Sequence, residues 1–163
     1  MTGLRRLAAF WAVLGFAALM GVAIYRLGSR TQEALAAPLD VVHWLTLIAV
    51  VAFMAYTEGY RGFQQSFSPR FAGRVVHLKA DGSLLEALLA PAYAMGYFSA
   101  PRRVLISTWV LTVMIIAFVL ALRLVPQPWR GVLDAGVVVG LLWGVTVTVW
   151  QTVARLRTRT VPA

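Results

Sequence analysis

Cysteine is absent from this sequence of 163 residues, and charged residues make up only 13% of it. The lack of cysteine excludes disulfides, thiolate metal ligands and cysteine nucleophiles. Charged residues make up about a quarter of an ordinary soluble domain, whereas 60% of this chain is hydrophobic and its mean hydropathy is +0.77. The composition therefore indicates a protein whose surface faces lipid rather than water.

Familiar catalytic patterns are also missing. The sequence contains no glycine-rich phosphate loop, no His-Glu-x-x-His and no Gly-x-Ser-x-Gly. We therefore predict no enzymatic activity and no cofactor. The net charge of +9 comes from basic residues beside the apolar segments rather than from a basic and aromatic patch, so nucleic acid is not an expected partner. The expected partner is the lipid bilayer.

Four apolar runs, at 7–25, 41–57, 104–122 and 132–153, approach the length of about 20 residues that crosses a bilayer as a helix. Inside lipid a helix satisfies its own backbone polar groups, and no segment has the alternation of a barrel strand. The sequence thus predicts an all-α polytopic membrane bundle that forms a single domain, 1–163. We interpret the first run as a retained helix, because the Ala-x-Ala at 34–36 lies too far beyond it for signal cleavage.

The distribution of lysine and arginine predicts the orientation, because basic residues concentrate on the cytoplasmic side. With a cytoplasmic N-terminus, most basic residues lie inside, and these are Arg5, Arg6, Arg61, Arg70, Arg74, Lys79, Arg102, Arg103, Arg155, Arg157 and Arg159. Only Arg26, Arg30, Arg123 and Arg130 then lie outside. We therefore expect an inner-membrane protein with both termini in the cytoplasm.

The long loop at 58–103 is predicted to contain two pieces. Its first part continues the second helix and is expected to stop near residues 66–69, because Pro69 disfavours helix at the preceding residue. Its second part begins with a capping box, Ser83 and Glu86, and stays apolar over 84–98. That length is too short to span, so we expect an interfacial or re-entrant helix. A fifth span is the alternative, and it would separate the two termini.

Three glycines of the fourth run, Gly136, Gly140 and Gly144, recur every four residues. They lie on one helix face and permit close approach of another backbone. We predict a helix-packing face, either within the bundle or with another subunit. Ala55 and Gly59 of the second helix are the internal partners that the sequence suggests.

Two polar groups are candidates for function, because charge in lipid is costly. Near the outer face, Asp40 and His43 share one side of the second helix, and Asp134 lies close to Arg130 in the fourth. If they meet, they form a proton relay or a weak metal site. The simpler interpretation has Asp40 capping its helix and Asp134 pairing with Arg130.

At the inner end of the second helix, Glu58, Arg61 and Gln65 are spaced to share one surface, and Gln151 of the fourth run lies at a similar level. This spacing predicts a Glu–Arg ion pair. The group is either a gate or headgroup-binding site, or a charged helix end whose side chains reach water.

Several short motifs resemble a group of small, uncharacterised bacterial membrane proteins. They are Glu-Gly-Tyr-Arg-Gly-Phe-Gln at 58–64, Phe-Ser-Pro at 67–69, Pro-Gln-Pro-Trp-Arg at 126–130 and Leu-Asp-Ala-Gly at 133–136. The resemblance covers the last three spans and implies no activity or ligand.

The leading hypothesis is a non-enzymatic structural, assembly or accessory subunit that packs with itself or with a membrane complex through the glycine face. The alternative is a small transporter or channel component that works as an oligomer, with Asp134, His43 and Glu58 lining a path. A third possibility is recognition of the membrane surface by the basic loop and its apolar segment.

Overall fold

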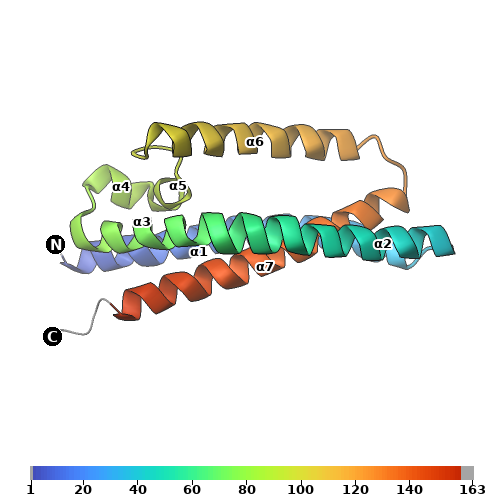
Figure 1. Cartoon of the computed structure of the whole chain (residues 1–163). Helices are drawn as coiled ribbons and strands as arrows, with labels where there is room; N and C mark the ends of the chain where they lie inside the picture. The colour runs from blue at the N-terminus through green and yellow to red at the C-terminus, as the bar shows by residue number, and fades with distance from the viewer. Residues whose placement is uncertain (1, 159–163) are drawn as a thin grey trace.

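A computed structural model describes residues 2–158, which are almost entirely helical. The elements are α1 (Thr2–Leu35), α2 (Val41–Met54), the π-helix η1 (Ala55–Phe67), α3 (Ser68–Asp81), α4 (Leu84–Leu88), α5 (Ala90–Met95), α6 (Arg102–Leu122) and α7 (Trp129–Thr158) (Figure 1). Within these residues, four continuous helices are long and apolar enough to cross a membrane: α1, the fused α2–η1–α3, α6 and α7. The predictions of an all-helical fold and of four apolar helices are confirmed.

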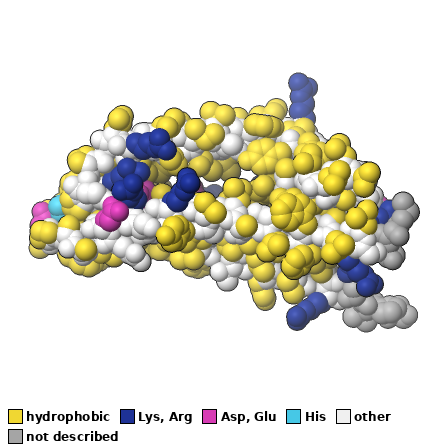
Figure 2. Space-filling model, turned by 180° about the vertical axis from the view of Figure 1, so that it is seen from behind, with side chains coloured by type: hydrophobic (Ala, Val, Ile, Leu, Met, Phe, Trp, Pro, Cys, Tyr) yellow, Lys and Arg dark blue, Asp and Glu magenta, His cyan; other side chains and the backbone are white. Residues whose placement is uncertain are grey.

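The start of α1 and the end of α7 lie at the same end of the molecule (Figure 1). Seen from behind, the surface is mainly hydrophobic along its middle, and charged side chains gather toward the two ends (Figure 2). This is the distribution expected of helices that cross an apolar layer. Arg159, which the sequence groups with the inner basic residues, lies outside the described residues.

The second helix does not stop near Pro69, so this prediction was wrong. It continues through η1 and α3 to Asp81, a run of 41 residues. In the π-helix η1, a backbone N–H donates to the carbonyl five residues earlier, rather than four residues earlier as in an α-helix. The N–H of Ser68 accordingly donates to the carbonyl of Phe63. A π-helix of 13 residues is unusual, because most π segments are single turns.

Contacts with α7 explain why the helix passes Pro69. Proline has no N–H, so the carbonyl of Gln64 loses its donor in the π pattern. The side-chain amide of Gln151 donates to that carbonyl at 3.2 Å. Arg155 donates to the carbonyl of Pro69 itself at 2.8 Å. The Gln151 bond therefore replaces the one that proline removes, and the Arg155 bond adds a second link to α7 at the same place.

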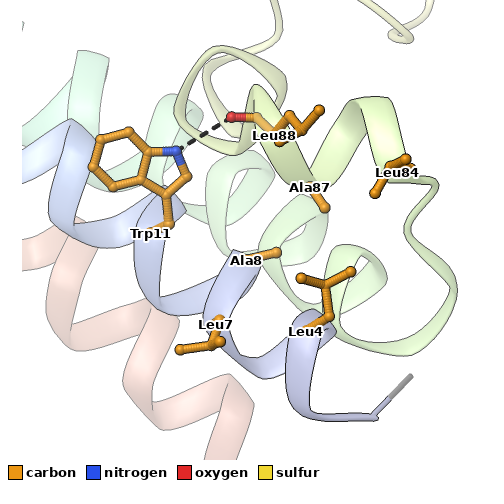
Figure 3. Close-up of a pocket in the computed structure, with 7 residues that line it drawn as sticks. All are labelled: Leu4, Leu7, Ala8, Trp11, Leu84, Ala87 and Leu88. Atoms are coloured by element: carbon orange, nitrogen blue, oxygen red, sulfur yellow. Dashed lines mark hydrogen bonds between the residues drawn. The ribbon is translucent and has the colours of Figure 1, made fainter.

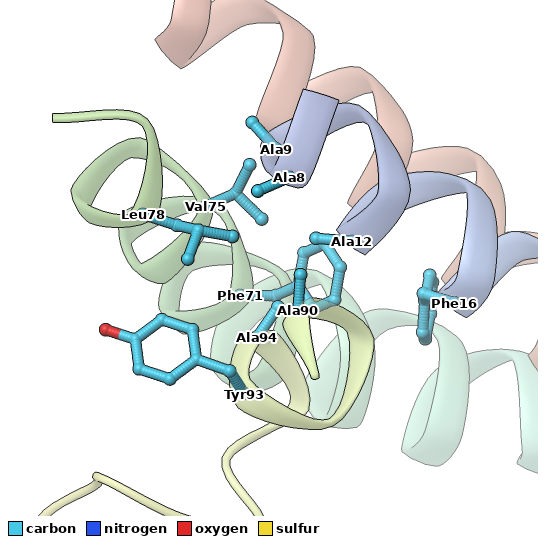
Figure 4. Close-up of a cluster of buried hydrophobic side chains, with 10 residues drawn as sticks. All are labelled: Ala8, Ala9, Ala12, Phe16, Phe71, Val75, Leu78, Ala90, Tyr93 and Ala94. Carbon is cyan, nitrogen blue, oxygen red and sulfur yellow. The ribbon is translucent and has the colours of Figure 1, made fainter. Parts of the chain in front are cut away.

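The apolar core lies between α1, α3 and α5 at the end of the molecule where α1 begins (Figure 4). Small alanines on α1 allow close approach, and Phe16 packs on Phe71 of α3 with ring centroids 4.9 Å apart and the rings tilted. The remaining core residues are Ala8, Ala9, Ala12, Val75, Leu78, Ala90, Tyr93 and Ala94.

The segment predicted as one helix at 84–98 is two short helices, α4 and α5, joined at Leu89. The predicted capping box is present, since the side chains of Ser83 and Glu86 bond to each other's backbone N–H. Trp11 of α1 donates to the carbonyl of Leu88 at 3.3 Å (Figure 3). Further along α1, Gly15 lies against Pro91. The two short helices therefore lie against α1, with α4 nearer to the start of α1 than α5.

Arg74 holds the turn that follows α5. Its guanidinium donates to the carbonyls of Tyr93 at 2.7 Å, Phe98 at 2.7 Å and Ser99 at 3.0 Å. It also lies over the Tyr93 ring, 3.9 Å from the centroid. The turn needs this support because Ser99 has a positive φ angle of 49°, which is unfavourable for a residue with a side chain. One side chain thus fixes the chain just before α6 begins.

We expect Arg74→Ala to destabilise the fold by about 3 kcal/mol, because three carbonyls lose a charged donor. Equilibrium unfolding in mixed detergent micelles measures this change. Arg103→Ala is the matched control, because Arg103 is exposed at the start of α6. Equal effects of the two substitutions would contradict the role of Arg74.

Candidate functional site along the fourth helix

The glycine face of α7 packs against α2 and η1 of the same chain. Gly136, Gly140 and Gly144 are all buried. A methyl group added at Gly136 would lie 2.5 Å from Val50, and one added at Gly144 would lie 2.5 Å from the ring of Phe63. The predicted packing face therefore has an internal partner, although Val50 and Phe63 were not the partners expected from the sequence.

Gly59, which the sequence did suggest, packs under a different residue of α7. A Cβ at Gly59 would lie 2.9 Å from the indole of Trp143. That indole donates to the side-chain oxygen of Gln64 at 3.0 Å. Further along, the hydroxyls of Ser68 and Thr148 are buried and 2.7 Å apart. These two hydrogen bonds therefore fix the register of α7 against the fused α2–η1–α3 helix.

This register places η1 beside the middle of α7. Gly140 lies about 15 Å along the axis from Arg130, at 1.5 Å per residue. Gly144 lies about 16 Å from Arg155 by the same measure. Glu58 packs on Gly140, where an added Cβ would lie 3.1 Å from the Cβ of Glu58. Glu58 therefore lies midway between the charged ends of α7, not at its inner end.

Glu58, Arg61 and Gln65 do not form the predicted ion-paired group. No salt bridge joins Glu58 to Arg61 among residues 2–158. The physical reason is η1, because a π-helix changes the angular spacing and residues three apart no longer share a face. Glu58 is half-buried against α7, whereas Arg61 and Gln65 are exposed. Gln151 meets Gln64 instead of this group.

At the other end of the bundle, Asp40 caps α2. Its carboxylate accepts from the backbone N–H of His43 at 2.9 Å and lies 2.6 Å from Nδ1 of the same residue. The backbone N–H of His43 is the main cause that holds the pKa of Asp40 below its ordinary value. The His43 ring also packs on Trp129, with centroids 4.2 Å apart. This arrangement fixes where α2 and α7 begin.

Asp134 is buried, with 1% of its side chain exposed, and Arg130 Nε lies 3.8 Å from its carboxylate. Neither carboxylate oxygen has a hydrogen-bond partner in the described part of the chain. No hydrogen bond or ion pair joins Asp134 to Asp40 or His43. No group of three His, Cys, Asp or Glu side chains suited to one metal ion occurs within residues 2–158. The structure does not bring together the three ligands that the metal hypothesis needs.

Sequence reasoning missed two residues that organise this region, Gln64 and Arg74. Both lie in the 58–103 loop, and neither side chain was assigned a contact with the bundle from the sequence. Gln64 bonds to Trp143 and Gln151 of α7, and Arg74 bonds to the turn before α6. The available signal was the phenylalanine at every fourth position, 63, 67 and 71, which indicates a packed helix rather than a loop.

Comparison with family models, curated proteins and solved structures found no match for this chain.

Substitution of the glycines by alanine should destabilise the protein in a graded order. Gly144→Ala and Gly136→Ala each force a neighbour to move and should cost about 1–3 kcal/mol. Gly140→Ala should cost less, because the nearest atom is 3.1 Å from the new Cβ. Gly21→Ala, in α1 with nothing within 4 Å, is the control. Unfolding in detergent tests the order, and a shift at Gly21 as large as at Gly144 would contradict it.

Replacement of Asp40 should change the pH dependence of stability. Because folding lowers the pKa of Asp40, its stabilising effect is complete above about pH 4 and is lost as the pH falls through the lower folded pKa. Asp40→Asn keeps an N-cap oxygen but should remove this acid-dependent loss. Asp40→Ala should also lower the melting temperature at neutral pH. Thermal melts from pH 2 to pH 7 measure both effects, and identical pH profiles for wild type and Asp40→Asn would count against them.

Proposed function

We propose that the chain is a multi-pass integral protein of a bacterial inner membrane, with both termini in the cytoplasm and a non-enzymatic assembly or accessory role. The four long apolar helices support insertion. The shared end of α1 and α7 supports termini on one side (Figure 1). The excess of basic residues at that end supports a cytoplasmic location.

The main observation that supports an assembly role is the isolation of α6. Among the described residues, α6 does not pack along any other helix. At its start it contacts the turn before it, where the hydroxyl of Tyr97 lies 2.8 Å from that of Thr112 and its ring meets Trp109 edge to face. None of the most apolar window of α6 is buried. A helix that is held near its two ends, by Tyr97 and by the buried Leu122, and is bare between them supports packing against a partner in the membrane.

The exposed surface of α6 includes Ala117 and Ala121, four residues apart. Small residues at this spacing let two membrane helices approach closely. The glycine face of α7 is already covered by α2 and η1, so we assign assembly to α6 instead. The hydroxyls of Ser68, Thr148 and Thr152 bond within the bundle, which supports a packing role for them rather than a catalytic one.

Native mass spectrometry of the protein extracted gently from its own membrane tests this proposal. The wild type should carry a second copy or another membrane protein. The double substitution Ala117→Leu and Ala121→Leu should reduce that species at least five-fold, because the larger side chains prevent close approach. Ala52→Leu, at an exposed position of α2, should leave it unchanged. A wild type recovered only as a monomer would refute the assembly role.

A small transporter or channel component, working as an oligomer, is the second candidate. The buried carboxylate of Asp134 favours it, because Arg130 lies 3.8 Å away but neither oxygen accepts a hydrogen bond in the described chain. So does Glu58, which lies beside the middle of α7. Ion flux in proteoliposomes that is lost in Asp134→Asn and Glu58→Gln would support this role. Flux that is unaffected by both would exclude it.

A further inference from the structure

The exposed side of η1 and the start of α3 carries a row of polar side chains that we call the arginine stripe, Arg61, Gln65 and Arg70. All three are exposed, unlike the neighbours that pack on α7. Among residues 2–158, the side chains of Arg61 and Gln65 have no hydrogen bond or ion pair. Arg70 donates to the carbonyl of Ser66 at 2.8 Å. The stripe therefore offers donors that the chain itself does not use.

The stripe faces the side of the bundle on which α6 lies. Arg74 reaches the turn that leads into α6, and Arg70 precedes Arg74 by one helical turn. Arg70 in turn bonds to Ser66, whose hydroxyl donates to the carbonyl of Arg61 at 3.1 Å. By spacing, Gln65 follows Arg61 by four residues and Arg70 follows Gln65 by five, which is close to one turn at each step in this segment. In the view of Figure 1, α6 runs above the fused α2–η1–α3 helix and does not pack along it.

Arg61 lies deep in the proposed bilayer, where a guanidinium without a partner is costly in free energy. Arg61 lies between Gly59 and Phe63, which pack on Trp143 and Gly144 in the middle of α7. A guanidinium keeps its charge in proteins, and its side chain is too short to reach the interface from the middle of a bilayer of about 30 Å. Charged groups at such a depth pair with an opposite charge or with water. Arg61 therefore requires an acceptor from outside this chain.

We propose that the arginine stripe binds the phosphate headgroup of an anionic phospholipid from the cytoplasmic leaflet. Both arginines contact the bound headgroup, Arg70 from the side of the leaflet surface and Arg61 from the deeper side. Arginine and glutamine both donate in directions that suit phosphate oxygens. This proposal rests on the membrane insertion proposed above.

Charge decides between a lipid and a second copy of the chain as the occupant. A two-fold contact through this face would bring Arg61 and Arg70 of one copy against the same residues of the other. Such like-charge contacts are unfavourable. An anionic lipid has the complementary charge and reaches the stripe by lateral diffusion. The exposed Arg102 and Arg103, at the start of α6, add positive charge near the entrance.

Titration of the delipidated full-length protein with phosphatidylglycerol or phosphatidylcholine, followed by native mass spectrometry, tests the site. The wild type should retain phosphatidylglycerol more strongly. Arg61→Gln and Arg70→Gln should each weaken that binding about five-fold. Arg61→Lys should retain most of it, because the charge remains. Arg123→Gln is the matched control at the other end of α6 and should bind as the wild type does.

Equal retention of the two lipids, or full binding by Arg61→Gln, would overturn the lipid site. An oligomer that dissociates in Arg61→Gln would also overturn it, because a protein would then cover the stripe. Circular dichroism of each variant verifies that the fold is kept. Extraction of the cell membranes with alkaline carbonate separates the two proposals: release of the chain would refute membrane insertion, whereas retention with no lipid preference would refute only the site.

Discussion

The close contact between α7 and the fused α2–η1–α3 helix fixes most of this structure. Gly136, Gly140 and Gly144 remove the side chains that would hold the two helices apart. The contact also sets their register, since Gly140 receives Glu58 and Gly144 receives Phe63. Once that register is fixed, the motif at 58–64 must lie beside the middle of α7. The same glycines therefore decide both the stability of the bundle and the depth of its polar residues.

The continuity of the second helix depends on the same contact. Proline would tend to end an isolated helix here, because it leaves a carbonyl without its donor, and π segments of this length are rare. Here Gln151 and Arg155 of α7 supply hydrogen bonds to the carbonyls of Gln64 and Pro69. The helix then delivers Arg74 to the turn after α5, where it bonds three carbonyls. A local irregularity in one helix is thus stabilised by side chains that are distant in sequence.

The position of α6 follows from that turn. Because Arg74 holds the chain before α6, the helix can start at a defined place without packing along the bundle. Two surfaces result, the bare side of α6 and the arginine stripe of η1. One is apolar and suits another membrane helix, and the other is cationic and suits an anionic headgroup. Assembly and lipid binding would therefore use different surfaces of the same molecule.

The sequence by itself determined the helical fold, the four apolar helices, the capping box of Ser83 and Glu86, and the packing role of the glycine face, because these depend on composition and on short-range spacing. Only the tertiary structure decided that the second helix passes Pro69 and that Glu58 and Arg61 lie apart beside the middle of α7. The physical reason is that both outcomes depend on hydrogen bonds and packing between residues about 80 positions apart, which local propensity does not encode.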